Sequence, residues 1–218
     1  MHTLKIGDIA VTWLGHASFL IEGDEIIYTD PYVLPQSPKK ADIVLVTHDH
    51  FDHCDKDNIR KLNAEHVFGP HGVTAKLGTG DTVKAGKKFS AGNITINAVE
   101  AYNTNKFRSP GQPFHPRGLG VGYVIEMNNR RIYHAGDTDN IKEMSSLGRI
   151  DVALLPIGGT YTMTMKEAVE AAGIIKPLHL IPMHYNSDRY GVNGINADTT
   201  ELSMLLTKGV VNVLEPLV

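Results

Sequence analysis

The chain has 218 residues, of which 42% are hydrophobic, and its formal net charge is −3 with histidine neutral. This length predicts a single domain over residues 1–218 with a core large enough to fold without disulfides, which one cysteine could not form within the chain. The acidic balance argues against a nucleic-acid partner, and no apolar stretch has the length of a membrane span. Because the first residues lack the layout of a signal peptide, we expect a cytoplasmic protein.

The first hundred residues favour short strands, because apolar runs alternate with glycine, proline, asparagine and aspartate. Strands are expected at Ile9–Leu14, Ser18–Glu22, Glu25–Thr29 and Ile43–Val46, then a short helix at Asp57–Leu62, a strand at Val67–Phe68 and a helical turn at Val73–Leu77. A meander of Thr82–Lys84, Lys87–Ser90 and Ile94–Ala101 is expected to follow.

The second half opens with a long loop, Asn103–Gly120, which is rich in proline, glycine and basic residues. Beyond it we expect a hairpin of Gly122–Met127 and Arg131–His134, a helix near Ile141–Leu147 capped by Asp139, and a buried strand at Asp151–Pro156. A capping box at Thr164–Glu167 predicts a helix to about Ile175. The last elements expected are a strand at Leu178–Met183, a helix at Thr199–Leu206 and a strand at Val210–Leu214.

The strongest chemical signal is the cluster His48-x-His50-x-Asp52-His53, which directly follows an aliphatic strand. In an extended backbone His48 and His50 project to the same side, so that two imidazoles can hold one metal ion. Zinc accepts imidazole nitrogen and carboxylate oxygen, and a catalytic site leaves a position open for water. A structural zinc site would normally use cysteines, and a chance histidine-rich loop would not need four potential ligands within six residues.

Two later residues complete the predicted ligand set. Asp137 follows Gly136, whose lack of a side chain allows an unusual backbone angle. His184 follows the apolar run Leu180–Met183. Several apolar runs end in such groups, Asp30 among them, and side chains at strand ends are held rigidly and yet reach solvent.

In series these motifs resemble the metallo-β-lactamase superfamily, and most closely its small stand-alone branch of metal-dependent hydrolases that includes ascorbate-phosphate lactonase. Supporting segments are Trp13–His16, Asp30-Pro31, Tyr133–Thr138, Leu155–Gly159 and Ile181–Tyr185. The resemblance implies an α/β fold, a four-layer αββα sandwich with metals at one edge. It also implies that His48 and His50 share a first metal with a third histidine, that Asp52, His53 and His184 hold a second, and that Asp137 bridges both.

The chain departs from the family pattern at the third histidine, where Tyr102-Asn103 stands in the expected segment. The first site could therefore be weak, the enzyme could use one metal, or His115 could move in from the long loop. His115 could instead act as a catalytic residue that protonates a leaving group or touches substrate. His71 is a weaker substitute for the missing ligand.

These residues predict an enzyme, a metal-dependent hydrolase that acts on an ester, lactone or phosphodiester. Asp52 would bind the metal and would also orient the activated water. The cofactor is expected to be one or two Zn2+ ions, with Mn2+ or Fe as alternatives. Two divalent ions outweigh the ligand charges, so a small anionic substrate is expected, and Lys106, Arg108 and Arg117 could add positive charge. The alternative is a metal-binding or ligand-sensing module with an incomplete site; a homo-oligomer is possible under either hypothesis.

Overall fold

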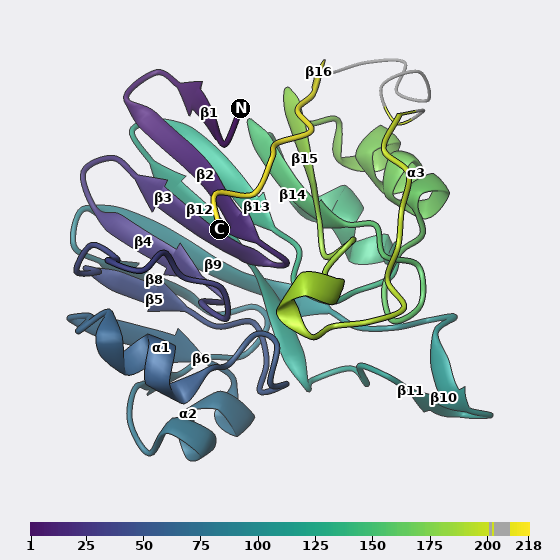
Figure 1. Ribbon diagram of the computed structural model, residues 1–218, viewed down its shortest axis with the longest axis horizontal. Helices are drawn as coiled ribbons and strands as arrows, with labels where there is room; N and C mark the ends of the chain where they lie inside the picture. Colours follow the sequence, from purple (N-terminus) through teal and green to yellow (C-terminus); the bar gives the residue numbers. More distant parts are fainter. Residues whose placement is uncertain (201, 203–209) are drawn as a thin grey trace.

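The computed structural model describes residues 1–200, 202 and 210–218. Within these residues two mixed sheets face each other, and helices cover the outer side of each (Figure 1). The first sheet has the order β1 (Thr3–Ile6), β2 (Ile9–Gly15), β3 (Ser18–Glu22), β4 (Ile26–Thr29), β5 (Ile43–Leu45), β6 (His66–Gly69) and β7 (Asp81–Thr82). The second has the order β16 (Val210–Val211), β15 (His179–Met183), β14 (Val152–Pro156), β13 (Arg130–His134), β12 (Gly120–Met127), β9 (Ile94–Ala101) and β8 (Lys88–Ala91).

The central strands of the first sheet, β2 to β5, are buried on both faces because they are apolar at most positions. Along β5, Ile43 and Leu45 belong to the core between the sheets, whereas Val44 packs on the outer side with Ile59 of α1 (Lys56–Lys61) and Val73 of α2 (His71–Leu77). This alternation is the period-two geometry of a strand. The continuous aliphatic run therefore makes a strand with a sheet on one side and helices on the other.

On the second sheet the principal outer helix is α3 (Met165–Ile175). It begins with the predicted capping box, in which Thr164 and Glu167 bond each other's backbone N–H groups. Its buried face is built from alanines and Ile175, which join the core between the sheets. The predicted αββα sandwich is thus confirmed, and no helix in the described part of the chain is long and apolar enough to cross a membrane.

Several predicted elements differ from the observed ones. Strand β1 was not predicted, and β7 pairs in parallel with β6 of the first sheet, so that it does not form a meander with β8 and β9. The long loop contains a hairpin of β10 (Phe107–Ser109) and β11 (Gln112–Pro113). The segment after Asp139 is a 3-10 helix, η1 (Lys142–Ser146), and no side chain caps it. The expected helix Thr199–Leu206 falls largely outside the described residues, and the last strand is shorter than expected.

The charge of Glu167 is expected to stabilise the start of α3. Burial opposes ionisation of this carboxyl, but the Lys106 ammonium and the Thr164 N–H lower its pKa to about 2. Because the folded-state pKa is depressed, the stabilisation is complete above the unfolded pKa of about 4.3. It is lost as the pH falls toward 2.

Glu167→Gln keeps the capping geometry and removes only the charge, so we expect it to lower the unfolding free energy by up to about 1 kcal/mol at pH 7. The difference from the wild type should shrink between pH 4.5 and pH 3. Urea denaturation of both proteins at several pH values measures it. A difference that stays constant with pH would show that the charge is not the cause.

Candidate metal centre

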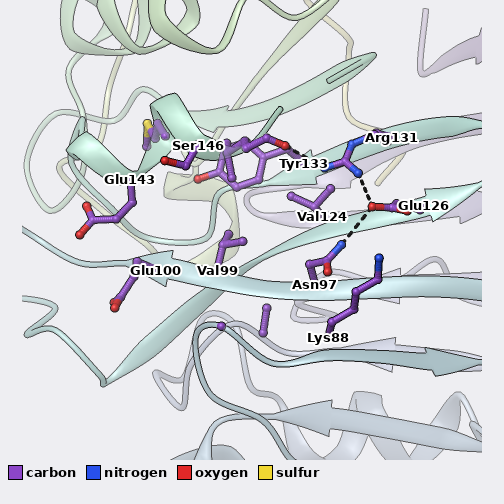
Figure 2. A pocket seen from close by; sticks show the side chains of 14 residues that line it. Lys88, Asn97, Val99, Glu100, Val124, Glu126, Arg131, Tyr133, Glu143 and Ser146 are labelled. Carbon is purple, nitrogen blue, oxygen red and sulfur yellow. Dashed lines mark hydrogen bonds and ion pairs between the residues drawn. The ribbon is translucent and has the colours of Figure 1, made fainter. Parts of the chain in front are cut away.

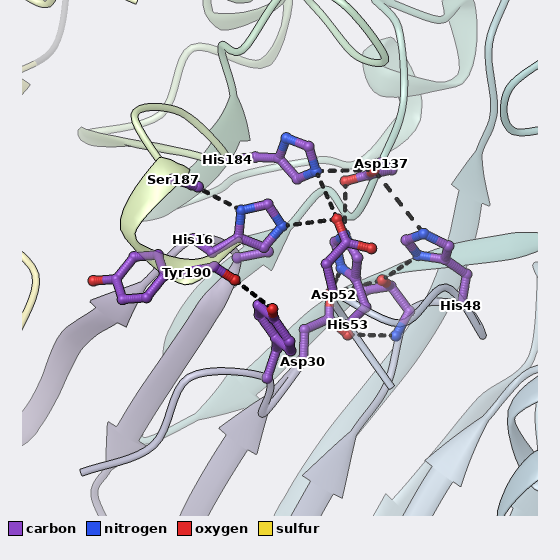
Figure 3. A network of polar contacts seen from close by, with 12 residues as sticks. His16, Asp30, His48, Asp52, His53, Asp137, His184, Ser187 and Tyr190 are labelled. Carbon is purple, nitrogen blue, oxygen red and sulfur yellow. Dashed lines mark hydrogen bonds and ion pairs between the residues drawn. The ribbon is translucent and has the colours of Figure 1, made fainter. Parts of the chain in front are cut away.

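The candidate site lies at the edge of the sandwich where strands of both sheets end. Asp30 follows β4, His48 comes three residues after the end of β5, Asp137 comes three residues after β13, and His184 directly follows β15. Figure 3 shows His48, Asp137 and His184 converging from different strands. Parallel neighbours β4 and β5, like β13, β14 and β15, bring their carboxyl ends to one edge. The sheet topology therefore assembles residues that are far apart in the sequence.

The carboxylate of Asp137 is the centre of the cluster. Its oxygens lie 3.1 Å from Nε2 of His184, 3.2 Å from Nε2 of His115, 3.3 Å from Nε2 of His53 and 4.0 Å from Nε2 of His48. These four histidines come from three segments of the chain, because His48 and His53 both follow β5. One carboxylate thus lies between two sets of imidazoles.

Ligand atoms in the site fall into overlapping groups whose members lie within 4.8 Å of one another. One group is His48, His50 and His115, another contains His16, Asp52, His53 and His184, and a third is His48, His53 and Asp137. All seven predicted site residues are therefore brought together, and His16 joins them. His71, the weaker substitute for the missing histidine, is exposed at the start of α2 and belongs to none of these groups.

His115 lies next to His48 and His50. Its ring lies 5.0 Å from that of His48 and 4.9 Å from that of His50, centroid to centroid. Asn103, which stands where the histidine was expected, accepts hydrogen bonds from the backbone N–H and the Nδ1–H of His115 through Oδ1. Its amide nitrogen donates to Asp139 and to the carbonyl of Tyr161, which fixes the orientation of the amide. Asn103 thus holds His115 so that Nε2 faces the site.

The same arrangement fixes two other rings. Nδ1 of His53 donates to Asp30 at 2.7 Å, and Nδ1 of His48 lies 3.0 Å from the hydroxyl of Thr47. Because that hydroxyl donates to Asp30, it accepts from His48. In each ring Nε2 is left free to face the cluster, as in metal sites where a partner sets the tautomer of a ligating histidine.

His16 supports the carboxylate of Asp52. Its Nε2 lies 3.2 Å from Oδ2 of Asp52, and its Nδ1 lies 2.9 Å from Oγ of Ser187. His16 and His184 are also joined through their backbones, since the N–H of His184 donates to the carbonyl of His16. Both residues, like Asp30, have positive φ angles. Such backbone strain costs about 1–3 kcal/mol per residue and is concentrated at functional sites.

The residues present fit a divalent metal. Buried polar atoms without a hydrogen-bond partner among the described residues include Nε2 of His48, His53 and His184 and Oδ1 of Asp137. His53 and His184 contact Asp137 as ion pairs without a hydrogen bond, and a buried polar group that lacks its hydrogen bond costs about 1–3 kcal/mol. Four of these atoms belong to one cluster, and each is an atom type that zinc binds. A cation at this place would satisfy them together.

The electrostatics of the site lead to the same conclusion. Burial alone would raise the pKa of Asp137, but His184, His53 and His115 lower it well below the ordinary value. Burial alone would lower the pKa of His53, but Asp137, Asp30 and Asp52 raise it well above the ordinary value. Both shifts arise from carboxylate charge enclosed among imidazoles. A divalent cation balances the same charge.

Sequence-based reasoning missed the roles of Asp139 and Asn103. Asp139 was expected to cap the next helix, but its carboxylate accepts from the backbone N–H groups of Thr104 and Asn105 and from the side chain of Asn103. It therefore fixes the start of the long loop. No local pattern reveals these contacts, because they join segments about 35 residues apart.

A cavity of about 570 Å3 opens above the cluster. Asp52, His115, Asp137 and His184 line its floor; Phe51, Arg108, Phe114, Tyr161 and the segment 191–193 are among the residues of its walls. This volume is within the range of small-molecule pockets, about 300–1,000 Å3. The candidate metal centre is therefore accessible to a small substrate.

A second cavity, of about 440 Å3, lies against β9, β12, β13 and η1 (Figure 2). Within it Glu126 contacts Arg131 and accepts from Asn97. None of the clustered ligands lines it. It lies outside the candidate metal centre.

Gly158 is expected to be essential for the position of His184. A Cβ atom at this residue would lie 2.4 Å from the backbone oxygen of His184 and 3.0 Å from Cβ of Ile195. Since backbone cannot move aside easily, Gly158→Ala should lower the unfolding free energy by about 1–3 kcal/mol, as other overpacked sites do. Chemical denaturation of the metal-free protein measures the change.

Gly173→Ala is the matched control. Gly173 lies inside α3, and a Cβ there meets nothing within 4 Å. This substitution should leave stability unchanged or raise it by up to about 1 kcal/mol, because alanine is the better helix former. Equal stability of the two variants would contradict the steric role of Gly158.

Comparison with known proteins shows the family. Residues 10–184 match the family model described as a beta-lactamase superfamily domain. A UPF0173 metal-dependent hydrolase from Archaeoglobus fulgidus is 36% identical over 192 residues, covering 81% of this chain and 83% of the relative. A relative with the same description from Pyrococcus abyssi is 33% identical and covers 95% of this chain and 97% of its own length.

Solved structures agree with this assignment. A crystal structure of a protein from Parabacteroides distasonis superposes with a TM-score of 0.82 at 32% identity and covers 98% of both chains. The metallo hydrolase Igni18 from Ignicoccus hospitalis superposes with a TM-score of 0.76 at 29% identity, over 95% of both chains. With the αββα sandwich and the histidine–aspartate cluster at its edge, these matches establish that the chain is a metal-dependent hydrolase of the metallo-β-lactamase superfamily.

Proposed function

We propose that the protein hydrolyses a small anionic ester, lactone or phosphodiester with two metal ions, preferably zinc. His48, His50 and His115 would hold the first ion, and Asp52, His53 and His184 the second. Asp137 would bridge them. The observation that carries the assignment is the position of the Asp137 carboxylate within 4.0 Å of Nε2 atoms from both histidine sets.

The donor set favours zinc. Imidazole nitrogen with carboxylate oxygen suits Zn2+, although Mn2+ and Fe accept the same ligands. When bound, a divalent ion lowers the pKa of water to near neutrality and polarises a carbonyl or phosphoryl oxygen. The role proposed for His115 is that of a ligand, and its rigid hydrogen bonds to Asn103 support this role over that of a mobile proton donor.

The protein's own residues would orient the reactants. Asp52 lines the cavity floor, and the hydrogen bond to His16 holds one of its oxygens, so the carboxylate is a fixed acceptor for the attacking water. Asp30 and Thr47 keep His53 and His48 from rotating. Fixed groups of this kind lower the cost of organising the site when the reaction occurs.

The test combines metal analysis with a substrate panel. We expect purified protein to contain up to two equivalents of metal by mass spectrometry and to hydrolyse at least one class among lactones, aryl esters and phosphodiesters. A chelator should abolish turnover, and added Zn2+ should restore it. Tightly bound metal without turnover across a broad panel would favour a metal-binding module instead. Bound iron would overturn the preference for zinc.

A further inference from the structure

The cavity above the metal centre has one wall that the proposed hydrolysis does not explain. Of the three basic residues in the long loop, Lys106 is paired with Glu167 at 2.9 Å and Arg117 is paired with Glu100 at 2.8 Å and Glu143 at 3.0 Å. Arg108 makes no ion pair with any described residue, and it alone of the three lines the cavity. Arg108 is exposed, and its charge lies at the wall of the space where a substrate would bind.

The structure holds Arg108 in a defined place. It lies on the β10–β11 hairpin, and its guanidinium sits over the ring of Phe114 at 5.6 Å from the centroid. Phe114 packs edge-to-face against Tyr161 at 4.9 Å between ring centroids. A guanidinium stacked on an aromatic face keeps its N–H donors free, and their planar arrangement matches the two oxygens of a carboxylate or phosphate.

The hairpin is anchored to the metal centre itself. The N–H of Phe114 donates to the carbonyl of Lys106, and the N–H of Asn103 donates to the carbonyl of His115. Phe114 directly precedes His115, which is a proposed ligand, so these two hydrogen bonds fix both residues. Arg108 and the metal centre are two fixed points along one cavity.

Aromatic side chains form part of the remaining walls. Phe114 and Tyr161 line one part of the cavity, and Phe51, whose side chain is 60% exposed, stands over another and packs edge-to-face on Tyr32. Aromatic side chains present large apolar faces to a ligand at low entropic cost. The cavity between the metals and Arg108 thus suits a planar or apolar group.

We propose that Arg108 is a specificity-determining residue that binds a carboxylate or phosphate group of the substrate. An apolar or planar part of the substrate would separate this group from the bond that is cleaved. This inference rests on the proposed function for the reacting group, and it adds the second anchor of the substrate. The substrate class is accordingly an ester, lactone or phosphodiester that carries a further anionic group remote from the cleaved bond.

The binding test does not require turnover. Benzohydroxamate and its 3- and 4-carboxy derivatives share one metal-binding group and differ only in the remote carboxylate. By calorimetry on the metal-loaded wild type, we expect one carboxy derivative to bind about tenfold more tightly than the parent compound, an advantage that decreases as salt concentration rises. Equal affinities, or no measurable binding of either carboxy derivative, would overturn the inference.

Variants assign the effect to one residue. Arg108→Gln should abolish the advantage of the carboxylate while leaving the affinity for unsubstituted benzohydroxamate unchanged, which also shows that the variant is folded. Arg108→Lys should retain part of it, because charge remains without the planar fork. Arg117→Gln, on the same loop but paired with Glu100 and Glu143, is the matched control and should retain all of it.

Kinetics separate this inference from the proposed function. The ratio of kcat/KM for mono-4-nitrophenyl glutarate to that for 4-nitrophenyl valerate should fall about tenfold in Arg108→Gln and stay constant in Arg117→Gln. An Arg108-dependent affinity without hydrolysis of any substrate would refute the proposed function and retain the anion site. Hydrolysis with a ratio that Arg108→Gln does not change would refute the anion site and retain the function.

Discussion

His115→Ala is expected to lose one of two metal ions per chain and to reduce hydrolysis 100-fold or more. Loss of a partner that only orients a metal ligand costs about 10–100-fold in affinity or activity, and loss of the ligand itself should cost more. His115 is the only histidine in the group with His48 and His50 that comes from the long loop. The measurement is metal content by mass spectrometry after dialysis, together with the activity at saturating Zn2+.

Asn103→Ala tests how His115 is held. It removes the acceptor for both N–H groups of His115 but leaves the imidazole in the chain. We expect a smaller effect than in His115→Ala, about 10–100-fold in metal affinity, and partial recovery of activity at high Zn2+. Recovery by metal would not be expected for loss of a proton donor.

The control for both variants is His71→Ala. His71 is exposed and lies outside the cluster, so metal content and activity should stay at wild-type values. If His115→Ala lost activity but kept both ions, His115 would be a proton donor or substrate contact. If His71→Ala lost an ion instead, the assignment of the first site would be wrong.

Strands and helices with a regular pattern could be predicted from the sequence. Strand β9 has the predicted bounds Ile94–Ala101 because its apolar residues alternate, and α3 begins where the capping box predicts. Between β12 and β13 the turn Asn128-Asn129 has two positive φ angles, which asparagine tolerates, so the hairpin followed from local chemistry. These elements depend on contacts close in the sequence.

Pairing over longer distances could not be predicted in this way. Strand β7 has two exposed residues, and nothing in its composition indicates that it pairs with β6 and not with β8. The β10–β11 hairpin is too short and too polar for a periodic signal. In both cases the tertiary structure selects the partner.

The same difference between local and long-range contacts applies to the candidate site. The cluster from His48 to His53 is local, so its metal chemistry followed from residue types and spacing. The substitution at Asn103 was visible in the sequence, and His115 and His71 could be named as substitutes for the missing histidine. The sequence could not place either of them beside His48, because His115 lies 12 residues beyond Asn103. Only the folded loop, with Asn103 bonded to His115 and to Asp139, brings the histidine to the cluster.

Asp137→Asn is expected to remove both metal ions and to lower hydrolysis by 1,000-fold or more. The carboxylate lies between both sets of histidines, so neutralising it removes the negative charge that both ions would share. Metal-ion catalysis supplies several kcal/mol, and each 1.4 kcal/mol is tenfold in rate. The substitution conserves shape, which separates the effect of charge from that of packing.

Thermal denaturation provides a second readout. A ligand that binds only the folded state stabilises it by about 2.7 kcal/mol at one hundred times its Kd. Added Zn2+ should therefore raise the Tm of the wild type and leave that of Asp137→Asn unchanged. Loss of only one ion in Asp137→Asn would place this carboxylate in a single site and refute the bridge.

Asp151→Asn separates the site from general stability. Asp151 is also a buried carboxylate, but it contacts Arg130 and Arg149 at the start of β14, away from the cluster. Its substitution should lower the Tm of the metal-free protein, because it weakens those ion pairs, yet preserve the increase in Tm that Zn2+ causes. Zn2+ would then raise the Tm of Asp151→Asn but not that of Asp137→Asn. Both variants lose a buried negative charge, but the histidines surround only Asp137. This difference would locate metal binding at Asp137.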